Sequence, residues 1–504
     1  MTTHWKYKRL FEILPATISW SILIFPLILA FTSPKGLSIV LLTYLSFWLL
    51  RAILMSYHLI DGYKHYKKDI NINWLRKLEE LPEESDWKKL YHVVIVPEYK
   101  EPIEILRSSV ESVIGSNYPE DRIIYVLATE ERDKDNARRD SAILMGEYRR
   151  RLKDYLVFEH PKDIPGEIIG KGPNITNAGK EIEKYMKQKK INPADVIVTT
   201  MDADNRVDKN YLACLSYKFI TDPDPIHKSF QPLPMYFNNI WDVPMAMRLI
   251  AMGSSSWQLI VSTKPTRLRN FSAHAQSLEA LIRVGYWSTQ SIVEDGHQFW
   301  RSFFKLNGRH ACIALYTPIY QDAVLAGGWI KTIKEQYLQK RRWSWGVSDI
   351  PYVMEHTFKD KKIYWLDRYA NALLLWEAHI SWATASLLLA TSAWLPLVFS
   401  PNFKRTIMAY NFPIIYSRLL TIAWLGMIIT LVISTLLVPP RGEKKPGKRI
   451  ALDWILTPIM LPITNIFLSG IPALVSQTML ACGRYLEYRT TIKSVKRSNI
   501  TTTE

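Results

Sequence analysis

The chain has 504 residues, 48% of them hydrophobic and 22% charged, and its 18 Trp, 26 Tyr and 17 Phe exclude a disordered chain without a core. Its three cysteines, Cys214, Cys312 and Cys482, stand far apart, which excludes a disulfide framework and a cysteine-based zinc site. Lys and Arg outnumber Asp and Glu by 64 to 47, a net charge of +17. Such a charge suits nucleic acid, an anionic membrane face or a phosphorylated substrate.

Two apolar segments open the chain. Residues 13–32 carry no charge and reach the roughly 20 residues that a bilayer span needs. A second apolar run covers residues 37–60 and is interrupted by Arg51, whose long side chain can reach toward the membrane interface. Because a second span follows the first at once, a cleaved signal peptide does not fit, and we expect a pair of transmembrane helices.

Apolar sequence returns in the last quarter of the chain. Residues 370–399 and 413–438 are typical of spans, whereas residues 454–481 are broken by prolines and a glycine. Such breaks are tolerated at membrane depth only where protein or water satisfies the freed backbone. We expect the broken part to be re-entrant, with a single crossing as the alternative.

Basic residues lie mainly before the first span, at positions 6–9, and after the fourth, at positions 441–449. The positive-inside rule therefore places the N-terminus and residues 61–369 in the cytosol of a multi-pass cell-membrane protein. Since the positive charge flanks membrane segments, we expect the lipid bilayer and no nucleic acid as its partner. The expected organisation is two N-terminal transmembrane helices (1–60), a linker (61–90), a catalytic-type domain (91–346), interfacial helices (347–369), a C-terminal transmembrane region with two helices and the broken segment (370–482), and a basic cytosolic tail (483–504).

Short apolar runs alternate with helical sequence in the long insert between the membrane segments. Continuous apolar runs at residues 91–97, 122–128 and 195–201, with a shorter run at 155–158, are typical of buried parallel strands. Helical segments separate them, the last of these at residues 181–189, so the sequence predicts an α/β, Rossmann-like domain with a mostly parallel sheet, inserted between transmembrane helices. Ligands of such sheets bind at the carboxyl ends of the strands, which makes the residues after each strand the first candidates for a site.

Asp202 and Asp204 directly follow the fourth predicted strand. Residues two apart on an extended backbone face the same side, so both carboxylates can approach one cation. Such oxygen ligands suit Mg²⁺ or Mn²⁺, and Mg²⁺ usually completes its shell with substrate phosphates. The alternative is a solvated acidic turn.

Two further groups of residues carry functional chemistry. Glu294 and Asp295 form a second acidic pair, a feature that by itself is common on protein surfaces. Gln339, Arg342 and Trp343 lie three and four residues apart on one face of a predicted helix. A forked guanidinium suits a diphosphate, and an indole suits stacking on a sugar ring. The alternative for this helix is an amphipathic helix on the membrane surface.

These three groups, in this order and between membrane segments, resemble the signature of the membrane-embedded family 2 glycosyltransferases, which have the GT-A fold and include cellulose and hyaluronan synthases. The resemblance covers residues 91–346 and the membrane layout, through the family's D-x-D, the E-D of its T-E-D, and its Q-x-x-R-W. Lys171, within G-K-G-P-N, resembles the family's K-A-G-A-L-N element with one extra residue. Val293 replaces the family's threonine, and Ala128 and Thr129 replace its nucleoside-reading aspartates, with Glu130 the nearest carboxylate.

The resemblance implies an inverting transfer from a nucleotide sugar, by default a UDP-sugar, to a growing glycan or a lipid-linked acceptor, with Mg²⁺ or Mn²⁺. Asp295 would be the catalytic base, and Asp202 and Asp204 would hold the metal. The donor-binding residues it implies are Lys171, Asp202, Glu130, Gln339 and Arg342, and the acceptor-binding residues are Trp343, Glu294 and His274. Two alternatives stay open: non-processive transfer to a polyprenyl phosphate or other lipid, and a catalytically inactive membrane scaffold.

Overall fold

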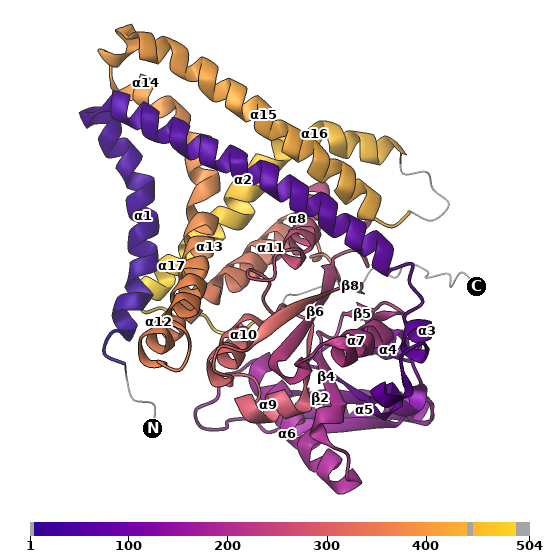
Figure 1. The fold of residues 1–504 in the computed structure, drawn as a ribbon. Coiled ribbons are helices and arrows are strands. Elements are labelled where there is room, and N and C mark those ends of the chain that lie inside the picture. The colour runs from indigo at the N-terminus through magenta and orange to yellow at the C-terminus, as the bar shows by residue number, and fades with distance from the viewer. Residues whose placement is uncertain (1–4, 441–446, 490–504) are drawn as a thin grey trace.

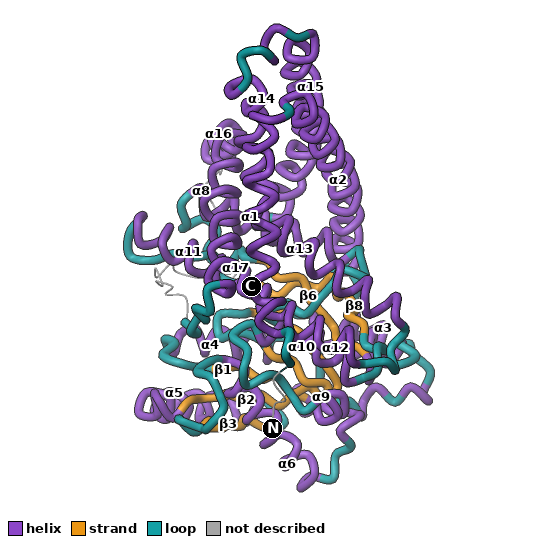
Figure 2. The backbone as a smooth tube through the Cα atoms, turned by 90° about the vertical axis from the view of Figure 1, so that its left-hand side faces the viewer, coloured by secondary structure: helices purple, strands orange, loops and turns teal. Residues whose placement is uncertain are grey.

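The structure, a computed structural model, describes residues 5–440 and 447–489. Long helices form one part of the molecule and an α/β domain the other (Figure 1). In the view turned by 90°, all the strands gather at the end opposite the tip formed by α14 and α15 (Figure 2). Most of the basic loop expected at residues 441–449, and the tail beyond residue 489, lie outside the described residues.

The described chain has five helical segments that are long and apolar enough to cross a membrane. They are α1 (Lys8–Thr32), α2 (Pro34–Asp69), α13 (Trp365–Thr391) with α14 (Leu395–Phe399), α15 (Ile407–Leu437), and the segment Ala451–Ala481, which α16 (Gly447–Asn465) and α17 (Ile471–Ala481) form. The expected boundary at residue 60 falls inside α2, because this helix continues to Asp69 beyond its apolar part.

The α/β domain lies between α2 and α13 in the chain. Its strands are β1 (Tyr91–Pro97), β2 (Ile123–Glu130), β3 (Asp154–His160), β4 (Val196–Thr200), β5 (Arg206–Val207), β6 (Lys228–Met235), β7 (His274–Ser277) and β8 (Ala311–Tyr320). Its helices are α3 (Trp74–Glu79), α4 (Ile103–Ile114), α5 (Lys134–Tyr148), α6 (Lys171–Lys189), α7 (Tyr211–Thr221), α8 (Met245–Ser262), α9 (Leu278–Val284), α10 (Glu294–Lys305), α11 (Trp329–Ser344) and α12 (Asp349–Lys359).

The strands form one mixed sheet in the order β3-β2-β1-β4-β7-β6-β8-β5. The first four strands pair in parallel, as the sequence predicts, but β7 is antiparallel to both of its neighbours, β4 and β6. Between β6 and β7 the chain forms α8, which packs against β6 and against the long helix α2. The chain leaves the sheet at the end of β6 and returns to it at the same end, so β7 runs antiparallel to β6.

The central strands are buried on both faces, which explains their unbroken apolar sequences. Val94 and Val96 of β1 belong to a core formed with α4 and α7, whereas Val93 and Ile95 belong to a second core with α6 and α9. Each buried side chain of this size contributes roughly 1.5–3 kcal/mol of transfer free energy. This two-sided packing fixes where β1, β2 and β4 end, and so fixes the edge at which the candidate site lies.

Arg51 lies within the apolar part of α2 and has partners in the protein. Its guanidinium donates to Oε1 of Glu377 on α13 and lies 4.9 Å from the ring centroid of Trp48. The other carboxylate oxygen of Glu377 accepts from Arg267 at 2.8 Å. A charge inside an apolar segment is tolerated when it is paired in this way.

Both ends of the α16–α17 segment contact the α/β domain. At one end, Arg248 of α8 donates to both carboxylate oxygens of Asp453, at 3.0 and 2.7 Å. Toward the other, the hydroxyls of Ser344 on α11 and Ser476 on α17 share a hydrogen bond of 2.9 Å. A π-helical turn at Ile466–Gly470 joins the two helices. The segment is also long and apolar enough for a single crossing, so the re-entrant arrangement stays a prediction.

Candidate active site

The candidate site lies at the carboxyl end of β4. The backbone N–H of Met201 still donates to the carbonyl of Ile95 at 3.1 Å, which continues the β1–β4 pairing up to Asp202. The Asp202 side chain is 41% exposed, and the Asp204 Oδ2 accepts from the backbone N–H of Asp322 at 3.3 Å. Both predicted metal ligands therefore stand at the sheet edge where α/β proteins bind their ligands.

Lys171 joins this strand end to a second helix. Its Nζ lies 3.0 Å from Oδ1 of Asp202, 3.1 Å from Oδ1 of Asp295 and 3.6 Å from Oε1 of Glu294. It also donates to the backbone carbonyl of Ser272 at 3.0 Å, and its side chain is only 5% exposed. Lys171 is the first residue of α6, whereas Glu294 and Asp295 are the first residues of α10. The structure thus brings together residues that the sequence places in three separate segments.

The electrostatics of this cluster are set by burial and by opposing charges. Burial lowers the pKa of Lys171, but Asp202, Asp295 and Glu294 outweigh it and hold the pKa well above its ordinary value. Burial raises the pKa of Asp295, Asp202 raises it further, and Lys171 opposes both. Burial and the neighbouring Asp295 raise the pKa of Glu294. A carboxylate with a raised pKa is a better proton acceptor near neutral pH than an ordinary aspartate.

Gly172 allows α6 to begin close to α10. A Cβ on this residue would meet the carbonyl oxygen of Ser288 well inside van der Waals contact and would lie 3.3 Å from Cβ of Glu294. Asn174 ties the same turn to the sheet, because its side-chain amide donates to the carbonyl of Ala128 at 2.8 Å. The G-K-G-P-N sequence is therefore the start of a helix held tightly against two neighbours, whereas the sequence alone predicted helix only from residue 181.

His274 lies behind Asp295, with its Nδ1 3.8 Å from Oδ1 of that residue. The indole N–H of Trp287 donates to its Nε2 at 3.1 Å, so the ring proton is on Nδ1, which lies 3.3 Å from the carbonyl of Phe271. Burial, and then the charge of Lys171, lower the pKa of His274 to about 3. His274 is therefore a neutral, fully buried side chain beside Asp295.

Helix α11 brings Arg342 and Gln339 to the site. Burial lowers the pKa of Arg342, but the charges of Tyr488, Asp202 and Glu294 outweigh it and raise the pKa above its usual value. Gln339 is 8% exposed, and its side-chain oxygen accepts from Nε2 of Gln336 at 3.1 Å. The charges of the carboxylates therefore reach Arg342, while Gln339 is buried on the same helix.

Trp343 belongs to an aromatic cluster at the side of the site that faces the apolar helices. Its ring centroid lies 5.8 Å from that of Tyr236 and 5.6 Å from that of Phe271, and Nζ of Lys340 lies 4.3 Å above it. The hydroxyl of Tyr236 is buried and has no hydrogen-bond partner among the described residues. Burial, and then the charges of Asp202 and Asp204, raise its pKa well above the ordinary value, so this hydroxyl faces the acidic pair. Such an unsatisfied group marks a place that a ligand can fill.

A divalent cation fits this donor set only together with a ligand. The described residues hold no group of three or more His, Cys, Asp or Glu side chains placed to bind a metal. Asp202 and Asp204 offer two carboxylates, and the orphan Tyr236 hydroxyl lies on the same side. Because Mg²⁺ is commonly held by one or two carboxylates and substrate phosphates, the residues present fit a metal that arrives with a diphosphate.

Glu130, the last residue of β2, has neighbours that the sequence patterns did not single out. It accepts from Nε of Arg132 at 2.7 Å, and the Arg132 guanidinium lies 4.5 Å from the ring centroid of Tyr99. Glu98 directly follows β1 and is 3% exposed, and burial raises its pKa to about 7. Because β1 lies between β2 and β4, these residues share the sheet edge with Asp202. The sequence could have indicated these residues, since Glu98 and Tyr99 directly follow a predicted strand.

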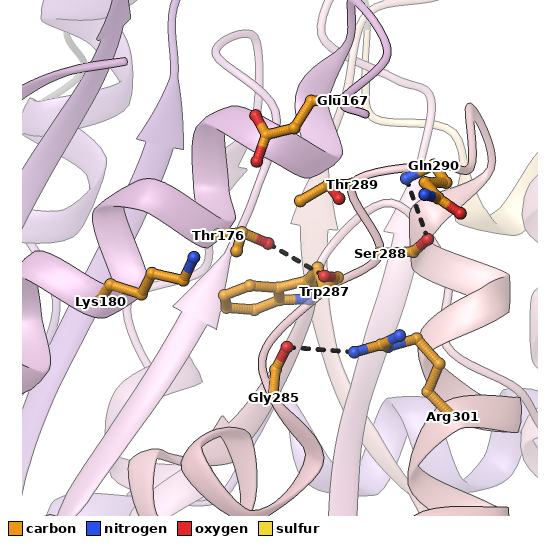
Figure 3. Close-up of a pocket in the computed structure, with 9 residues that line it drawn as sticks. All are labelled: Glu167, Thr176, Lys180, Gly285, Trp287, Ser288, Thr289, Gln290 and Arg301. Atoms are coloured by element: carbon orange, nitrogen blue, oxygen red, sulfur yellow. Dashed lines mark hydrogen bonds between the residues drawn. The ribbon is translucent and has the colours of Figure 1, made fainter. Parts of the chain in front are cut away.

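A cavity of about 260 Å³ is lined in part by Trp287 (Figure 3). Lys180 from α6 and Arg301 from α10 approach it from different sides. Trp287, which also lines the cavity, donates its indole N–H to His274. Arg301 donates to the carbonyl of Gly285 at 3.1 Å. None of the predicted site residues lines this cavity, so it is distinct from the cluster around Lys171.

Comparisons with known proteins give distant structural likenesses. No protein-family model and no curated protein sequence matches the chain. A mannosyltransferase from Pyrobaculum calidifontis, in complex with GDP-Man and Mn²⁺, is 13% identical with a TM-score of 0.40, over 85% of this chain and 98% of its own. Residues 1–349 of TarS from S. aureus, in complex with UDP-GlcNAc, are 11% identical with a TM-score of 0.34, over 79% of this chain and 93% of that one. GalNAc-T7, with UDP, GalNAc and Mn²⁺, is 13% identical with a TM-score of 0.34, over 58% of each chain. At TM-scores below 0.5 these likenesses assign no function.

Proposed function

We propose that the chain is a membrane glycosyltransferase that moves a sugar from a nucleotide-diphosphate donor to an acceptor hydroxyl with inversion. The observation that carries this proposal is the cluster around Lys171. One carboxylate with a raised pKa, Asp295, stands beside the Asp202–Asp204 pair and two cations, Lys171 and Arg342. A base on the acceptor side and positive charge on the leaving-group side are what a direct displacement requires.

The reaction needs one base and no covalent nucleophile. Asp295 accepts the proton of the acceptor hydroxyl as its oxygen attacks the anomeric carbon, while the bond to the diphosphate breaks on the opposite face, which inverts the configuration. Asp202 and Asp204 would hold Mg²⁺ or Mn²⁺, which would supply Lewis-acid stabilisation of the leaving diphosphate. Lys171 and Arg342 neutralise the remaining charge and fix the orientation of the diphosphate.

The nucleoside end of the donor is assigned to the ends of β1 and β2. The ring of Tyr99, stacked with Arg132, offers a plane for the base, and the Glu130 carboxylate offers an acceptor for ribose or base N–H and O–H groups. Glu98 adds a second buried carboxylate at this edge. These groups suit a nucleoside without selecting one, and UDP is the first donor to test.

The acceptor is assigned to the aromatic side of the site, where Trp343 packs against Tyr236 in a tilted arrangement and against Phe271 edge to face. α11, which carries Trp343, packs against the membrane-region helix α17. This closeness suits a growing glycan that leaves through the helices, and it suits a lipid-linked acceptor equally well. Trp343→Ala is expected to shorten the product or weaken acceptor use while hydrolysis of the donor by water stays measurable.

The alternative is an inactive membrane scaffold. A scaffold would not hydrolyse or transfer the sugar of a nucleotide donor, whereas an enzyme would. In the decisive experiment, membranes that contain the full chain are incubated with a panel of UDP- and GDP-sugars and Mg²⁺ or Mn²⁺. Donor hydrolysis and labelled product are then measured. We expect turnover with at least one donor, and loss of it in Asp295→Asn. Absence of nucleotide binding and of hydrolysis across the panel would contradict the proposal.

A further inference from the structure

The cavity beside Trp287 takes no part in the proposed reaction (Figure 3). Its volume of about 260 Å³ lies below the roughly 300–1,000 Å³ that is typical of pockets for drug-sized ligands. Gly285, Lys180 and Gln290 are exposed residues of its wall, so the cavity opens to solvent. It therefore suits a soluble ligand that is smaller than a nucleotide sugar.

Most residues that line the cavity are polar, and its charges do not balance. Two cations, Lys180 of α6 and Arg301 of α10, reach it from different helices, together with one carboxylate, Glu167. Oε2 of Glu167 lies 3.0 Å from Nε2 of His160, so this carboxylate already has a partner. The two cations and the one carboxylate leave the wall with a positive charge, which favours an anionic ligand.

Arg301 is a partly desolvated cation without a counter-charge. Its Nη2 donates to the carbonyls of Val284, Gly285 and Tyr286, at 3.3, 3.1 and 3.2 Å, and its Nε donates to that of Tyr286 at 3.3 Å. Burial lowers the pKa of Arg301, and no carboxylate in the described part of the chain forms an ion pair with it. Nη1, with two N–H groups, has no hydrogen-bond partner among the described residues. Because a desolvated charge is costly without a partner, a bound anion would offset part of this cost.

Further donors of the cavity wall are available to a ligand. The ammonium of Lys180 and the hydroxyl of Thr289 form no hydrogen bond or ion pair with any residue that the structure describes. The backbone of Thr289 is held in place, because its carbonyl accepts from the N–H of Ile168 at 3.0 Å. Oγ of Ser288 accepts from the N–H of Gln290 at 3.2 Å, which leaves its own proton to donate. The wall thus combines unused donors with positive charge.

We propose that this cavity binds a small phosphate-bearing anion, up to the size of a sugar monophosphate. Phosphate oxygens accept charge-assisted hydrogen bonds from Nη1 of Arg301 and from the ammonium of Lys180. The rest of the ligand lies against the indole of Trp287 and bonds to the hydroxyls of Ser288 and Thr289. This binding does not depend on the proposed function.

The cavity is linked to the candidate active site by two routes. An anion held between the two cations would tie α6 to α10, the helices that carry Lys171 and Asp295. The indole N–H of Trp287 donates to Nε2 of His274 at 3.1 Å, and Nδ1 of His274 lies 3.8 Å from Oδ1 of Asp295. The ligand is therefore expected to act as an effector that favours the Lys171–Asp295 contact. This second step rests on the proposed function.

Calorimetric titration of the full chain in detergent with glucose 1-phosphate and with inorganic phosphate tests the site without any nucleotide. Lys180→Met should weaken binding by roughly tenfold, because it removes a charge-assisted hydrogen bond. Lys187→Met removes the same charge from an exposed position of α6 that does not line the cavity, and it should bind as the unaltered chain does. Equal affinities of Lys180→Met and Lys187→Met, or no binding of either probe to the unaltered chain, would overturn the site.

The choice of probes separates the parts of the ligand. Tighter binding of glucose 1-phosphate than of inorganic phosphate would support a sugar phosphate, and equal binding of the two would support free phosphate at the same cations. Glucose that binds as tightly as glucose 1-phosphate would overturn the role of the anion. Thr289→Val, which removes a hydroxyl without a partner in the described chain, should weaken glucose 1-phosphate several-fold and leave folding intact.

The effect on the candidate active site is measured separately. Saturating glucose 1-phosphate should raise sugar transfer several-fold in the unaltered chain and in Lys187→Met, and should have a much smaller effect in Lys180→Met at the same concentration. Unchanged transfer at a concentration that saturates the cavity would overturn the effector role. If the chain neither binds nor turns over a nucleotide sugar, the proposed function fails, whereas the titration with the phosphate probes still decides the site.

Discussion

Nζ of Lys171 lies 3.1 Å from Oδ1 of Asp295, although 124 residues separate them in the chain. Each residue begins a helix, and the close approach of α6 and α10 brings the two side chains together. Because an ammonium favours the charged form of a carboxylate that it touches, the protonation of Asp295 depends on Lys171. The pKa of the proposed base therefore depends on a residue that we also propose to bind the donor.

Activity should decline on the acid side at a higher pH than an ordinary aspartate would cause. Asp295 accepts a proton only when deprotonated, and burial and Asp202 raise its pKa. Lys171→Met removes the charge that lowers this pKa, so the acid limb of the pH–kcat profile should move to higher pH. Lys187→Met, an exposed lysine of the same helix, is the matched control. An unshifted limb in an active, folded Lys171→Met protein would argue against the coupling.

Asp295→Asn should lower turnover by roughly 10²- to 10⁴-fold, because the amide keeps the size of the side chain but cannot accept the proton. Nucleotide affinity should persist, since Asp202, Asp204 and Arg342 are untouched. Sugar transfer and nucleotide binding are measured on the same preparation, with Asp135→Asn, an exposed carboxylate of α5, as the control. Near-normal transfer by Asp295→Asn would remove it as the base.

Removal of divalent metal should abolish transfer. The described residues give Asp202 and Asp204 no third carboxylate, histidine or cysteine placed to complete a metal shell, so the ion is expected to depend on the donor's phosphates. EDTA should stop the reaction, and Mg²⁺ or Mn²⁺ should restore it, while Asp204→Ala should not recover at the same metal concentration. Full activity in excess EDTA would refute the metal assignment.

Gly172→Ala should destabilise the protein and disturb the site. The added methyl group would collide with the backbone carbonyl of Ser288, which cannot turn away as a flexible side chain would. Gly146→Ala in α5 meets no atom within 4 Å and should instead stabilise its helix by about 0.5–1 kcal/mol. The Tm values of the two variants are compared by thermal unfolding in one detergent. Equal Tm values would show that α6 shifts away from Ser288 at little cost in stability.

The expected orientation places the α/β domain in the cytosol. A cysteine at Gly146, which faces open space on α5, should resist a membrane-impermeant thiol reagent in intact cells and react after permeabilisation. A cysteine at Asn402, in the exposed connection between α14 and α15, should react from outside. Both are introduced with Cys482→Ser, because Cys482 is exposed. The reverse pattern would invert the topology.

The sequence by itself determined the features that depend on short stretches of chain. Apolar length marked the long helices, and unbroken β-branched runs marked β1, β2 and β4 nearly to the residue. The position after β4 also placed Asp202 and Asp204 at the sheet edge, because the end of a strand that is buried on both faces brings the next residues of the chain to that edge. Periodicity and burial are local properties, so local sequence reports them.

Only the tertiary structure decided which distant residues meet. The polar start of α6 lacks an apolar period, and close packing against Ser288 makes it helical, so the sequence showed its helix only from residue 181. The antiparallel direction of β7 goes with the packing of α8 against β6 and α2, and the position of Tyr488 depends on the path of the chain after α17. Such contacts join segments far apart in the chain, and no local pattern encodes them, because their free energy comes from surfaces that exist only once the sheet and helices have packed.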